Sequence, residues 1–303
     1  MREIETCPIC RSTGRETIYR GTVDTSNIPE ALKNPYASHY QINRCTGCDL
    51  WFSSPIFEDN DIATLYEQAP HSNVMSGEEG NVKRTMQLYY ELARSHLRAR
   101  DRILDIGCDI GLMLKFAQED GFSELFGLEP NPIARREAAS LQGAVISSQF
   151  YEDQEYPESN FDLITFIHVV DHLIDPSRVV ERAFKHLKPG GVAVAVVHNS
   201  ESILAKLLGE RFPPFNMYHH YFFSKKTLAK LFESRGFEAV TVVSSRNCYS
   251  LGFFVRRLPL VPVKLRSAMA GILDRLWVGR LPITIPIGNI AIVARRPVVG
   301  SHA

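Results

Sequence analysis

Short apolar runs recur along the chain from residue 102 onwards, and segments with helical spacing of apolar residues lie between them. The runs predict seven strands, at Arg102–Ile106, Glu124–Leu128, Ala144–Ile146, Phe161–Ile167, Val192–Val197, Ala239–Val243 and Asn289–Ala294. Helices are predicted at Leu112–Glu119, from Pro132, at Pro176–Leu187 and from the capping residue Ser224 to Arg235, and Lys188–Gly191 is predicted to be a sharp turn. This alternation predicts a doubly wound, mostly parallel seven-stranded sheet with helices on both faces.

The first hundred residues follow other patterns. Residues 1–60 contain short β-like runs and turn formers, and they are too few to bury a large core alone. Residues 61–100 are predicted to be helical, with a short helix around Ile62, Leu65 and Tyr66 and a longer one from Met86 to Leu97, separated by a polar loop. We therefore expect an N-terminal module (1–60), a helical linker or lid (61–100) and a main domain (101–303).

Residues 251–286 interrupt the alternation just before the last predicted strand. They contain six basic residues against one acidic residue, Asp274, and a helix is expected from about Lys264 to Trp277. We interpret this segment as a basic, apolar insertion in the main domain. It is predicted either to contact an anionic membrane or a lipid-linked acceptor, or to form a dimer face or a lid.

The overall composition is that of an ordinary globular protein, with 45% hydrophobic and 22% charged residues. The 34 basic and 34 acidic residues balance, so the chain lacks the overall positive charge typical of nucleic-acid binders. The first residues do not resemble a secretory signal, and no apolar run is long enough to span a bilayer. We therefore expect a cytoplasmic protein with reduced thiols.

Two cysteine pairs stand out in the N-terminal module. Cys7 and Cys10 form one C-x2-C pair, and Cys45 and Cys48 form the other. This spacing directs two sulfur atoms at one point, and four thiolates are a common tetrahedral ligand set for Zn²⁺. The pattern predicts a structural zinc site, because four ligands leave no open position for water.

A glycine-containing turn follows the first strand of the main domain. Asp105 ends that strand, and Gly107 and Gly111 follow before a helix, with Asp109 between them. Glycines allow a ligand to approach the backbone closely, and the helix N-terminus offers free N–H groups. Glu129 ends the next strand, where a carboxylate is placed to accept hydrogen bonds from ribose hydroxyls. The turn therefore indicates a nucleoside-containing ligand.

Three interpretations compete for this turn. A dinucleotide site favours G-x-G-x-x-G, whereas this turn is G-x-x-x-G and carries acids that repel a pyrophosphate. A simple strand-to-helix turn needs no ligand. A cationic cofactor that bears an amino acid is favoured, since Asp105 is placed to hold its ammonium group.

The segment from about Ile103 to Val197 resembles the class I S-adenosylmethionine-dependent methyltransferases, which have a Rossmann-like fold. The similar motifs are ILDIGCDIG, GLEPN, NFDLITFIHVVDHLIDP and LKPGG. The resemblance implies that Glu129 binds the ribose, that His168 lies at the cofactor edge and that Phe150 lies near the adenine. Asp109 stands where these enzymes usually have glycine.

The resemblance extends to both sides of this segment. CPIC, RCTGCDLWFSSP and LYEQ look like the N-terminal part of a subgroup that modifies sugars or other small metabolites. HNSESILAKLLGERF and HHYFFSKKTLAKLFESRGFE also resemble that subgroup. A small-molecule acceptor is therefore expected.

Histidines are the candidates for a general base, because their ordinary pKa suits proton transfer near neutral pH. His172 follows Asp171 just beyond the fourth predicted strand, and His219 and His220 lie in the aromatic loop Phe215–Phe223. We interpret this loop as an exposed lid over the acceptor. For any single histidine, a role in packing or in orienting a loop is the favoured interpretation.

The sequence thus favours methyl transfer to oxygen or carbon of a small molecule such as a sugar, a glycolipid or a secondary metabolite. One alternative is an RNA methyltransferase that uses its zinc module for binding. Residues 1–70 contain six basic and ten acidic residues, a balance of −4 that repels phosphate, so nucleic acid is not expected as a partner. The other alternative is a non-catalytic scaffold, for which Asp109 is the support.

Overall fold

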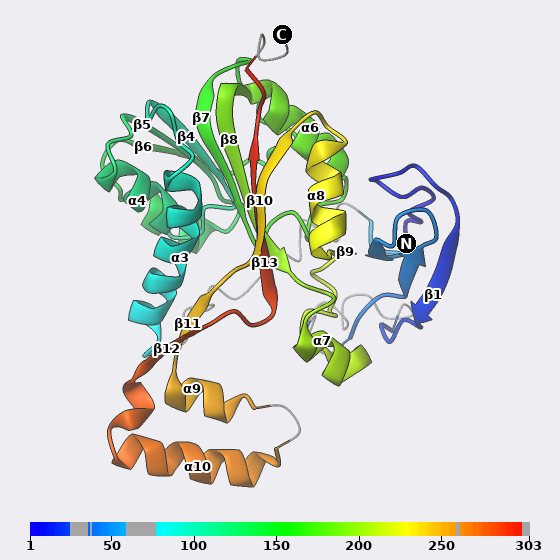
Figure 1. Ribbon diagram of the computed structural model, residues 1–303, viewed down its shortest axis with the longest axis vertical. Helices are drawn as coiled ribbons and strands as arrows, with labels where there is room; N and C mark the ends of the chain where they lie inside the picture. The colour runs from blue at the N-terminus through cyan, green and yellow to red at the C-terminus, as the bar shows by residue number, and fades with distance from the viewer. Residues whose placement is uncertain (25–35, 37, 59–76, 259–260, 299–303) are drawn as a thin grey trace.

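A seven-stranded sheet forms the centre of the protein, as the computed structural model of residues 1–24, 36, 38–58, 77–258 and 261–298 describes it (Figure 1). Its strands are β4 (Arg102–Ile106), β5 (Glu124–Leu128), β6 (Ala144–Ser147), β7 (Phe161–Ile167), β8 (Leu187–His198), β10 (Glu238–Ser244) and β13 (Asn289–Arg295). Their order is β10-β13-β8-β7-β4-β5-β6, and β13 runs antiparallel to both neighbours while the others are parallel. The predicted doubly wound, mostly parallel sheet is confirmed.

Helices cover both faces of this sheet (Figure 1). One face carries α3 (Glu79–Arg94), α4 (Leu112–Glu119) and α5 (Pro132–Ala138), and the other carries α6 (Pro176–His186) and α8 (Lys225–Glu233). Along β8, Val194 and Val196 belong to the core on the first side, while Ala195 and Val197 belong to the core on the second. Burial of both faces explains why the strands read as continuous apolar runs.

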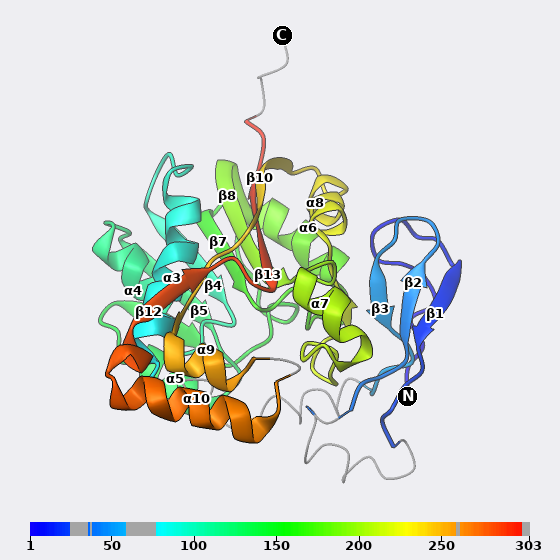
Figure 2. The same ribbon diagram turned by 60° about the horizontal axis from the view of Figure 1, so that its bottom comes forward.

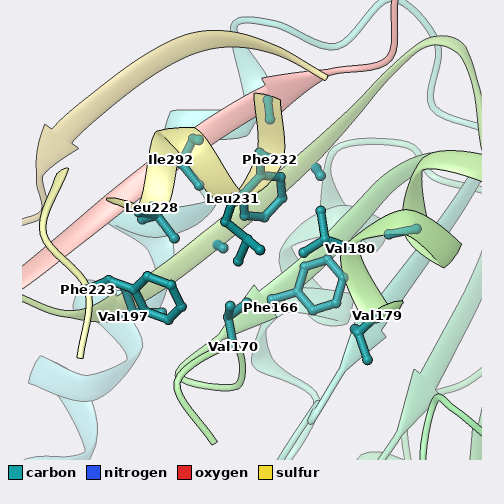
Figure 3. Close-up of a cluster of buried hydrophobic side chains, with 14 of the residues drawn as sticks. Phe166, Val170, Val179, Val180, Val197, Phe223, Leu228, Leu231, Phe232 and Ile292 are labelled. Carbon is teal, nitrogen blue, oxygen red and sulfur yellow. The ribbon is translucent and has the colours of Figure 1, made fainter. Parts of the chain in front are cut away.

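The core under α6 and α8 is drawn in Figure 3. Phe166 from β7 and Val180 from α6 lie beside Leu231 and Phe232 from α8, and all four side chains are fully buried. Removing a large side chain from such a core costs about 3–5 kcal/mol. This packing holds the ends of β7 and β8 in fixed positions.

One predicted turn lies inside a strand, at a point where the pairing register shifts and Gly190 has a φ of +84°. Lys188–Gly191 belongs to β8, which begins at Leu187 opposite Phe161. Gly190 donates a backbone hydrogen bond to Arg296, and Arg296 donates one back to Gly191. The C-terminal segment thus pairs with the predicted turn and draws it into the strand, an interaction that local turn chemistry does not reveal.

A second sheet contains the N-terminal strands β1 (Arg15–Tyr19), β2 (Ile42–Cys45) and β3 (Trp51–Ser53). Its fourth strand is β9 (Tyr221–Phe222), which pairs antiparallel with β3. The N-terminal module is therefore completed by a strand that comes about 170 residues later in the chain. The division of the chain near residues 60 and 100 stays a prediction.

The interpretation of Phe215–Phe223 as an exposed aromatic lid is wrong. Phe215 and Phe222 are buried against each other with ring centroids 4.8 Å apart, and Trp51 stacks on Phe215. Pairing of β9 with β3 buries these rings between the N-terminal strands and α7 (Ile203–Leu208). The partner surface that the aromatic residues need is supplied by the chain itself.

The predicted insertion projects from the sheet on a two-stranded ribbon of β11 (Asn247–Ser250) and β12 (Pro282–Ile285) (Figures 1 and 2). The ribbon carries α9 (Leu251–Arg256), α10 (Val263–Arg275) and the short helix η2 (Val278–Arg280). The predicted helix matches α10, whereas β11, α9 and β12 were not predicted. No helix within the described ranges is long and apolar enough to cross a membrane.

Two short helices, α7 (Ile203–Leu208) and η1 (Gly209–Arg211), follow β8 and were not predicted. The helix predicted around Ile62, Leu65 and Tyr66 lies outside the described residues. The longer predicted helix corresponds to α3, which begins at Glu79.

Candidate functional site

A large cavity opens at the carboxyl ends of β4, β5, β7 and β8, where ligands of open α/β sheets bind. Its volume is about 2440 Å³, larger than the roughly 300–1,000 Å³ typical of a site for one small molecule. The predicted site residues on its wall are Asp105, Gly107, Asp109, Glu129, Phe150, His168, His172 and His219. Gly111 and His220 are predicted site residues that do not line it. The volume suits two ligands side by side.

The glycine-containing turn has the left-handed backbone that its sequence suggests. Gly107 has a φ of +70°, and a Cβ there would lie 2.6 Å from Cγ2 of Val169. Gly111 has a φ of +81°, and its hydrogen faces Ala138 of α5 at a distance that leaves little room for a side chain. Gly107 therefore lets the backbone approach the cavity, whereas Gly111 lets α4 begin close to α5.

Asp105 is the most buried carboxyl group of the turn, with 2% of its surface exposed. The hydroxyl of Thr165 donates a 2.6 Å hydrogen bond to it. Burial, together with the nearby charges of Glu129 and Asp109, raises its pKa to about 7. Three carboxyl groups at one place make a site that favours a cation.

Glu129 is held in position by two backbone groups. Its Oε2 accepts a hydrogen bond from the Asp109 N–H at 2.9 Å, and its Oε1 accepts one from the Asn131 N–H at 2.8 Å. The Asn131 side chain caps α5, which fixes the turn after β5. The carboxylate is thus fixed at the end of β5 on the cavity wall, where sequence reasoning expects a ribose-binding acid.

Phe150 and His168 occupy different parts of the wall. The Phe150 ring is 38% exposed on the cavity wall, so one of its faces is open to stacking with a ligand. His168 has a left-handed φ of +56°, and its ring lies 5.0 Å from that of His198. Burial, and next the proximity of His198, lower the pKa of His168 to about 3, so its imidazole is neutral.

Asp171 lies at the centre of a histidine cluster. His172 Nε2 is 3.9 Å from Asp171 Oδ1, and His219 Nε2 is 3.9 Å from Asp171 Oδ2. The backbone N–H of His198 donates to the same Oδ2 at 3.3 Å. Burial lowers the pKa of both His172 and His219 and keeps these imidazoles neutral. The predicted Asp171–His172 pair is thus part of a larger group.

His220 does not belong to this group. It is fully buried outside the cavity, its Nδ1 lies 3.3 Å from the Leu173 carbonyl, and its ring packs near Tyr40. His219 and His220 both precede β9, yet His219 lines the cavity and His220 does not. The prediction of His220 as a base is wrong because its ring faces the core beneath the N-terminal module.

The four predicted zinc ligands converge elsewhere, away from the cavity wall. Cys7 Sγ lies 3.5 Å from Cys48 Sγ, and Cys10 Sγ lies 3.5 Å from Cys45 Sγ. All four sulfur atoms lie within 4.8 Å of one another. A tetrahedral ion with Zn–S bonds of about 2.3 Å separates its sulfur ligands by about 3.8 Å, so the group fits this ion.

Sequence reasoning missed the groups that orient the histidines. Asn289 Oδ1 lies 2.9 Å from His198 Nδ1, and Asn216 Oδ1 lies 3.1 Å from His219 Nδ1. The asparagines lie on β13 and in the loop before β9. No motif or spacing links them to the histidines, and only the folded chain brings them together.

The family described as a methyltransferase domain matches residues 79–242, more than half of the chain. Over 111 residues the chain is 32% identical to the tRNA U34 carboxymethyltransferase of Sulfurimonas denitrificans, a match that covers 35% of this chain and 38% of that protein. Over 137 residues it is 27% identical to the ubiquinone biosynthesis O-methyltransferase of Yersinia pestis, covering 42% and 55% respectively. The chain spans about half or less of these curated relatives.

Solved structures share the fold. A chain in the complex between the Haloferax volcanii Trm112 methyltransferase activator and the putative methyltransferase superposes with a TM-score of 0.52 at 14% identity, covering 73% of this chain and 95% of that one. The YcgJ protein from Bacillus subtilis gives a TM-score of 0.50 at 17% identity, covering 71% and 98%. At these identities the likeness shows the fold alone.

Proposed function

The chain belongs to the methyltransferase-domain family, whose members have the S-adenosylmethionine-dependent methyltransferase fold, and we propose that it transfers a methyl group from S-adenosylmethionine to oxygen or carbon of a small-molecule acceptor. The observation that carries this proposal is the acidic wall formed by Asp105 and Glu129 beside Gly107. It offers a cationic nucleoside cofactor both a counter-charge and hydrogen-bond acceptors.

In this proposal each part of the wall has one task. Asp105 holds the ammonium group of the cofactor, and Glu129 accepts hydrogen bonds from its ribose. Gly107 and Asp109 provide the backbone against the amino-acid part, and Phe150 stacks on the adenine. When bound, S-adenosylmethionine supplies an electrophilic methyl group on its sulfonium. His168 packs at the edge of the cofactor site.

The acceptor occupies the other part of the cavity, next to Asp171, His172 and His219. Neutral imidazoles carry a lone pair, so the cluster is suited to activate a hydroxyl group or a carbon acid. The first contribution of the protein is alignment of the acceptor with the methyl group, which alone supplies a large part of the rate. His172 and His219 remain our candidates for catalysis. His220 is no longer a candidate, because it does not line the cavity.

The cysteine group has a separate role in the proposal. We propose that Cys7, Cys10, Cys45 and Cys48 hold a structural Zn²⁺. Gly47 supports this assignment, because a Cβ at that position would come within 3.1 Å of Cys10 Sγ. Burial raises the pKa of the Cys48 thiol to about 11, so without a metal ion the thiol keeps its proton. A bound Zn²⁺ would replace the thiol protons.

Isothermal titration with S-adenosylmethionine and S-adenosylhomocysteine tests the donor assignment. We expect micromolar binding to the zinc-loaded protein and its loss in Asp105→Ala. The matched control is Asp101→Ala, since Asp101 lies just before the same strand but is exposed and paired with Lys188. Failure of both ligands to bind, or equal affinity in both variants, contradicts the proposal and favours a scaffold.

RNA is the alternative acceptor, and one relative is described as a tRNA carboxymethyltransferase. The acidic balance of −4 over residues 1–70 disfavours it, because phosphate binding needs basic groups. Filter binding with RNA at low and high salt decides between the two classes. Tight binding that weakens with salt would replace the small-molecule proposal.

The insertion suggests how a lipid-linked acceptor would reach the cavity. Leu265, Met269 and Ile272 are exposed and recur on one face of α10, the capping residue Leu276 is also exposed, and Trp277 is 72% exposed. Arg257 and Arg266 are among the basic residues around them and also line the cavity. We propose that this surface rests on an anionic membrane, since basic residues beside an apolar face suit its headgroups and acyl chains.

Flotation with anionic liposomes tests this surface. We expect the protein to float at low salt, and Ile272→Glu to remain in the soluble fraction. Val145→Glu serves as the control, because Val145 is similarly exposed but lies on β6, outside the insertion. Absence of flotation at low salt, or equal flotation of both variants, would rule out membrane contact through α10.

A further inference from the structure

The acceptor end of the cavity holds an unusual concentration of metal-ligating groups. Asp171 shares one set with His168 and His198 and a second set with His172 and His219, and within each set the ligand atoms lie within 4.8 Å of one another. From this geometry we infer that the cluster binds a divalent transition-metal ion, held by Asp171, His172 and His219. This site is distinct from the four cysteines of the N-terminal module.

Asp171 is the common ligand of both sets, and its surroundings call for a cation. The residue is 1% exposed, and its Oδ1 has no hydrogen-bond partner among the residues that the structure describes. Among the described residues, the ion-pair partners of Asp171 are His172 and His219. The Nε2 atom of each imidazole lies 3.9 Å from a carboxylate oxygen of Asp171. A buried carboxylate without a close positive partner costs several kcal/mol, which a bound metal ion would offset.

His219 presents a lone pair to this carboxylate. The amide of Asn216 is oriented by two backbone bonds, because its Nδ2 donates to the Pro213 carbonyl and its Oδ1 accepts from the Tyr218 N–H. The same Oδ1 faces His219 Nδ1 at 3.1 Å, so Nδ1 must carry the proton. The unprotonated Nε2 then faces Asp171 Oδ2, another acceptor, at 3.9 Å. Two acceptors that face each other are stabilised by a cation between them.

An asparagine amide orients the His198 imidazole as well. Its Nδ1 lies 2.9 Å from Asn289 Oδ1, and the Nδ2 of that amide donates to the Tyr89 hydroxyl, so Oδ1 is the atom that faces the imidazole. The Tyr89 hydroxyl in turn donates to Asn247. Metal-binding histidines usually donate their other N–H to an oxygen acceptor that fixes tautomer and orientation. Asn216 therefore fixes the tautomer of the ligand His219 in the way expected of a metal site, and Asn289 fixes that of the neighbouring His198.

The buried His219 ring lies against two neighbouring imidazoles, with its centroid 4.3 Å from that of His172 and 4.9 Å from that of His198. Two histidines and one carboxylate are a set that leaves coordination positions open to ligands. Bonds of about 2.0–2.2 Å put such ligands roughly 3–3.5 Å apart, so the side chains need to close by less than about 1 Å each.

The open positions face the cavity, and this assigns a class of acceptor. A metal ion held by these residues would supply a Lewis acid to a hydroxyl or enol oxygen of the acceptor and would lower the pKa of that group, as zinc does for bound water. With the ion bound, His172 and His219 would act as its ligands and not as bases. This role rests on the proposed methyl transfer, but binding of the metal does not. The acceptor class is a molecule that offers one or two oxygen ligands beside the atom that is methylated.

The test measures metal in the full-length protein, stripped and reloaded with Co²⁺ or Zn²⁺, by elemental analysis. We expect two equivalents in the wild type, and one in Asp171→Asn and in His219→Gln, with the cysteine site retained. The cobalt spectrum separates the sites, because thiolate ligands give charge-transfer bands that nitrogen and oxygen ligands lack. His186→Gln is the control, since His186 is buried and bonded to Tyr151 outside the cluster, and it should keep two equivalents. Asn216→Ala should weaken the second site by roughly 10–100-fold.

One equivalent in the wild type, or two in both variants of the cluster, would overturn the metal site. S-adenosylmethionine affinity is measured on the same samples, so the two proposals fail separately. Cofactor binding and methyl transfer with a single equivalent of metal would remove the second site only. Two equivalents without cofactor binding would keep the metal site and remove the proposed methyl transfer.

Discussion

Replacing Asp105 by asparagine should stabilise the cofactor-free protein at alkaline pH. The carboxyl group is buried, and its folded-state pKa of about 7 lies well above the ordinary value because ionisation inside the cavity is unfavourable. Asparagine keeps an oxygen that accepts the hydrogen bond from Thr165. The substitution therefore removes the cost of the charge while it keeps the shape of the side chain.

The magnitude follows from the difference in proton binding. The unfolded chain has already lost this proton above its ordinary pKa of about 3.9, whereas the folded protein keeps it up to about 7. The unfolded state thus binds fewer protons in this range, and wild-type stability falls as pH rises through it. From pH 5 to pH 8 the loss is roughly 2–3 kcal/mol, and Asp105→Asn should escape it.

Urea unfolding of both proteins without cofactor, at pH 5 and pH 8, measures this difference. Asp101→Asn is the control, because Asp101 is exposed and its pKa is lowered by Lys188, so it should show no such gain. The same variant should bind S-adenosylmethionine roughly 10–100-fold more weakly at pH 8, since it lacks the counter-charge. If the stability difference between Asp105→Asn and the wild type does not grow from pH 5 to pH 8, the argument that ionised Asp105 destabilises the cofactor-free protein is refuted.

Three other substitutions or treatments test separate parts of the site. Gly107→Ala should destabilise the protein by roughly 1–3 kcal/mol in urea unfolding, because of its positive φ and the close Val169, whereas Gly80→Ala, in open space on α3, should not. Phe150→Ala should weaken cofactor binding in titrations by about 1 kcal/mol without lowering stability, and unchanged affinity would place the adenine elsewhere. Removal of zinc by a chelator, or Cys10→Ser, should lower the melting temperature of the whole chain in calorimetry, and an unchanged transition would contradict a structural role for the ion.

The main sheet could be predicted from the sequence because its signals are local. Phe161–Ile167 and Leu112–Glu119 have the observed bounds of β7 and α4, since a buried strand and a glycine-bounded helix are each visible within about ten residues. The acids at the ends of β4 and β5 could be placed for the same reason, because parallel strands bring their carboxyl ends to one edge. Prediction was accurate where a single element sets the position of a side chain.

The acceptor end could not be predicted because it depends on contacts between distant segments. The aromatic run Phe215–Phe223 has the composition of an exposed lid, and only the pairing of β3 with β9 shows that it is buried. His219 and His220 are equivalent in sequence, yet one lines the cavity and the other lies outside it. The amides that orient His198 and His219 come from segments with no motif.

The pairing of β3 with β9 also connects the cysteine group to the acceptor end of the cavity. The Ser53 N–H donates to the His220 carbonyl at 2.8 Å, and the Ser53 hydroxyl donates to the His219 carbonyl at 3.2 Å. The His220 N–H donates in turn to the Asp171 carbonyl, so three bonds fix the backbone that carries His219 opposite Asp171. Asp105 and Glu129 have no such connection to β3 among the described contacts. A zinc ion that stabilises the N-terminal sheet would therefore support the acceptor cluster, while the cofactor wall depends on the main sheet alone.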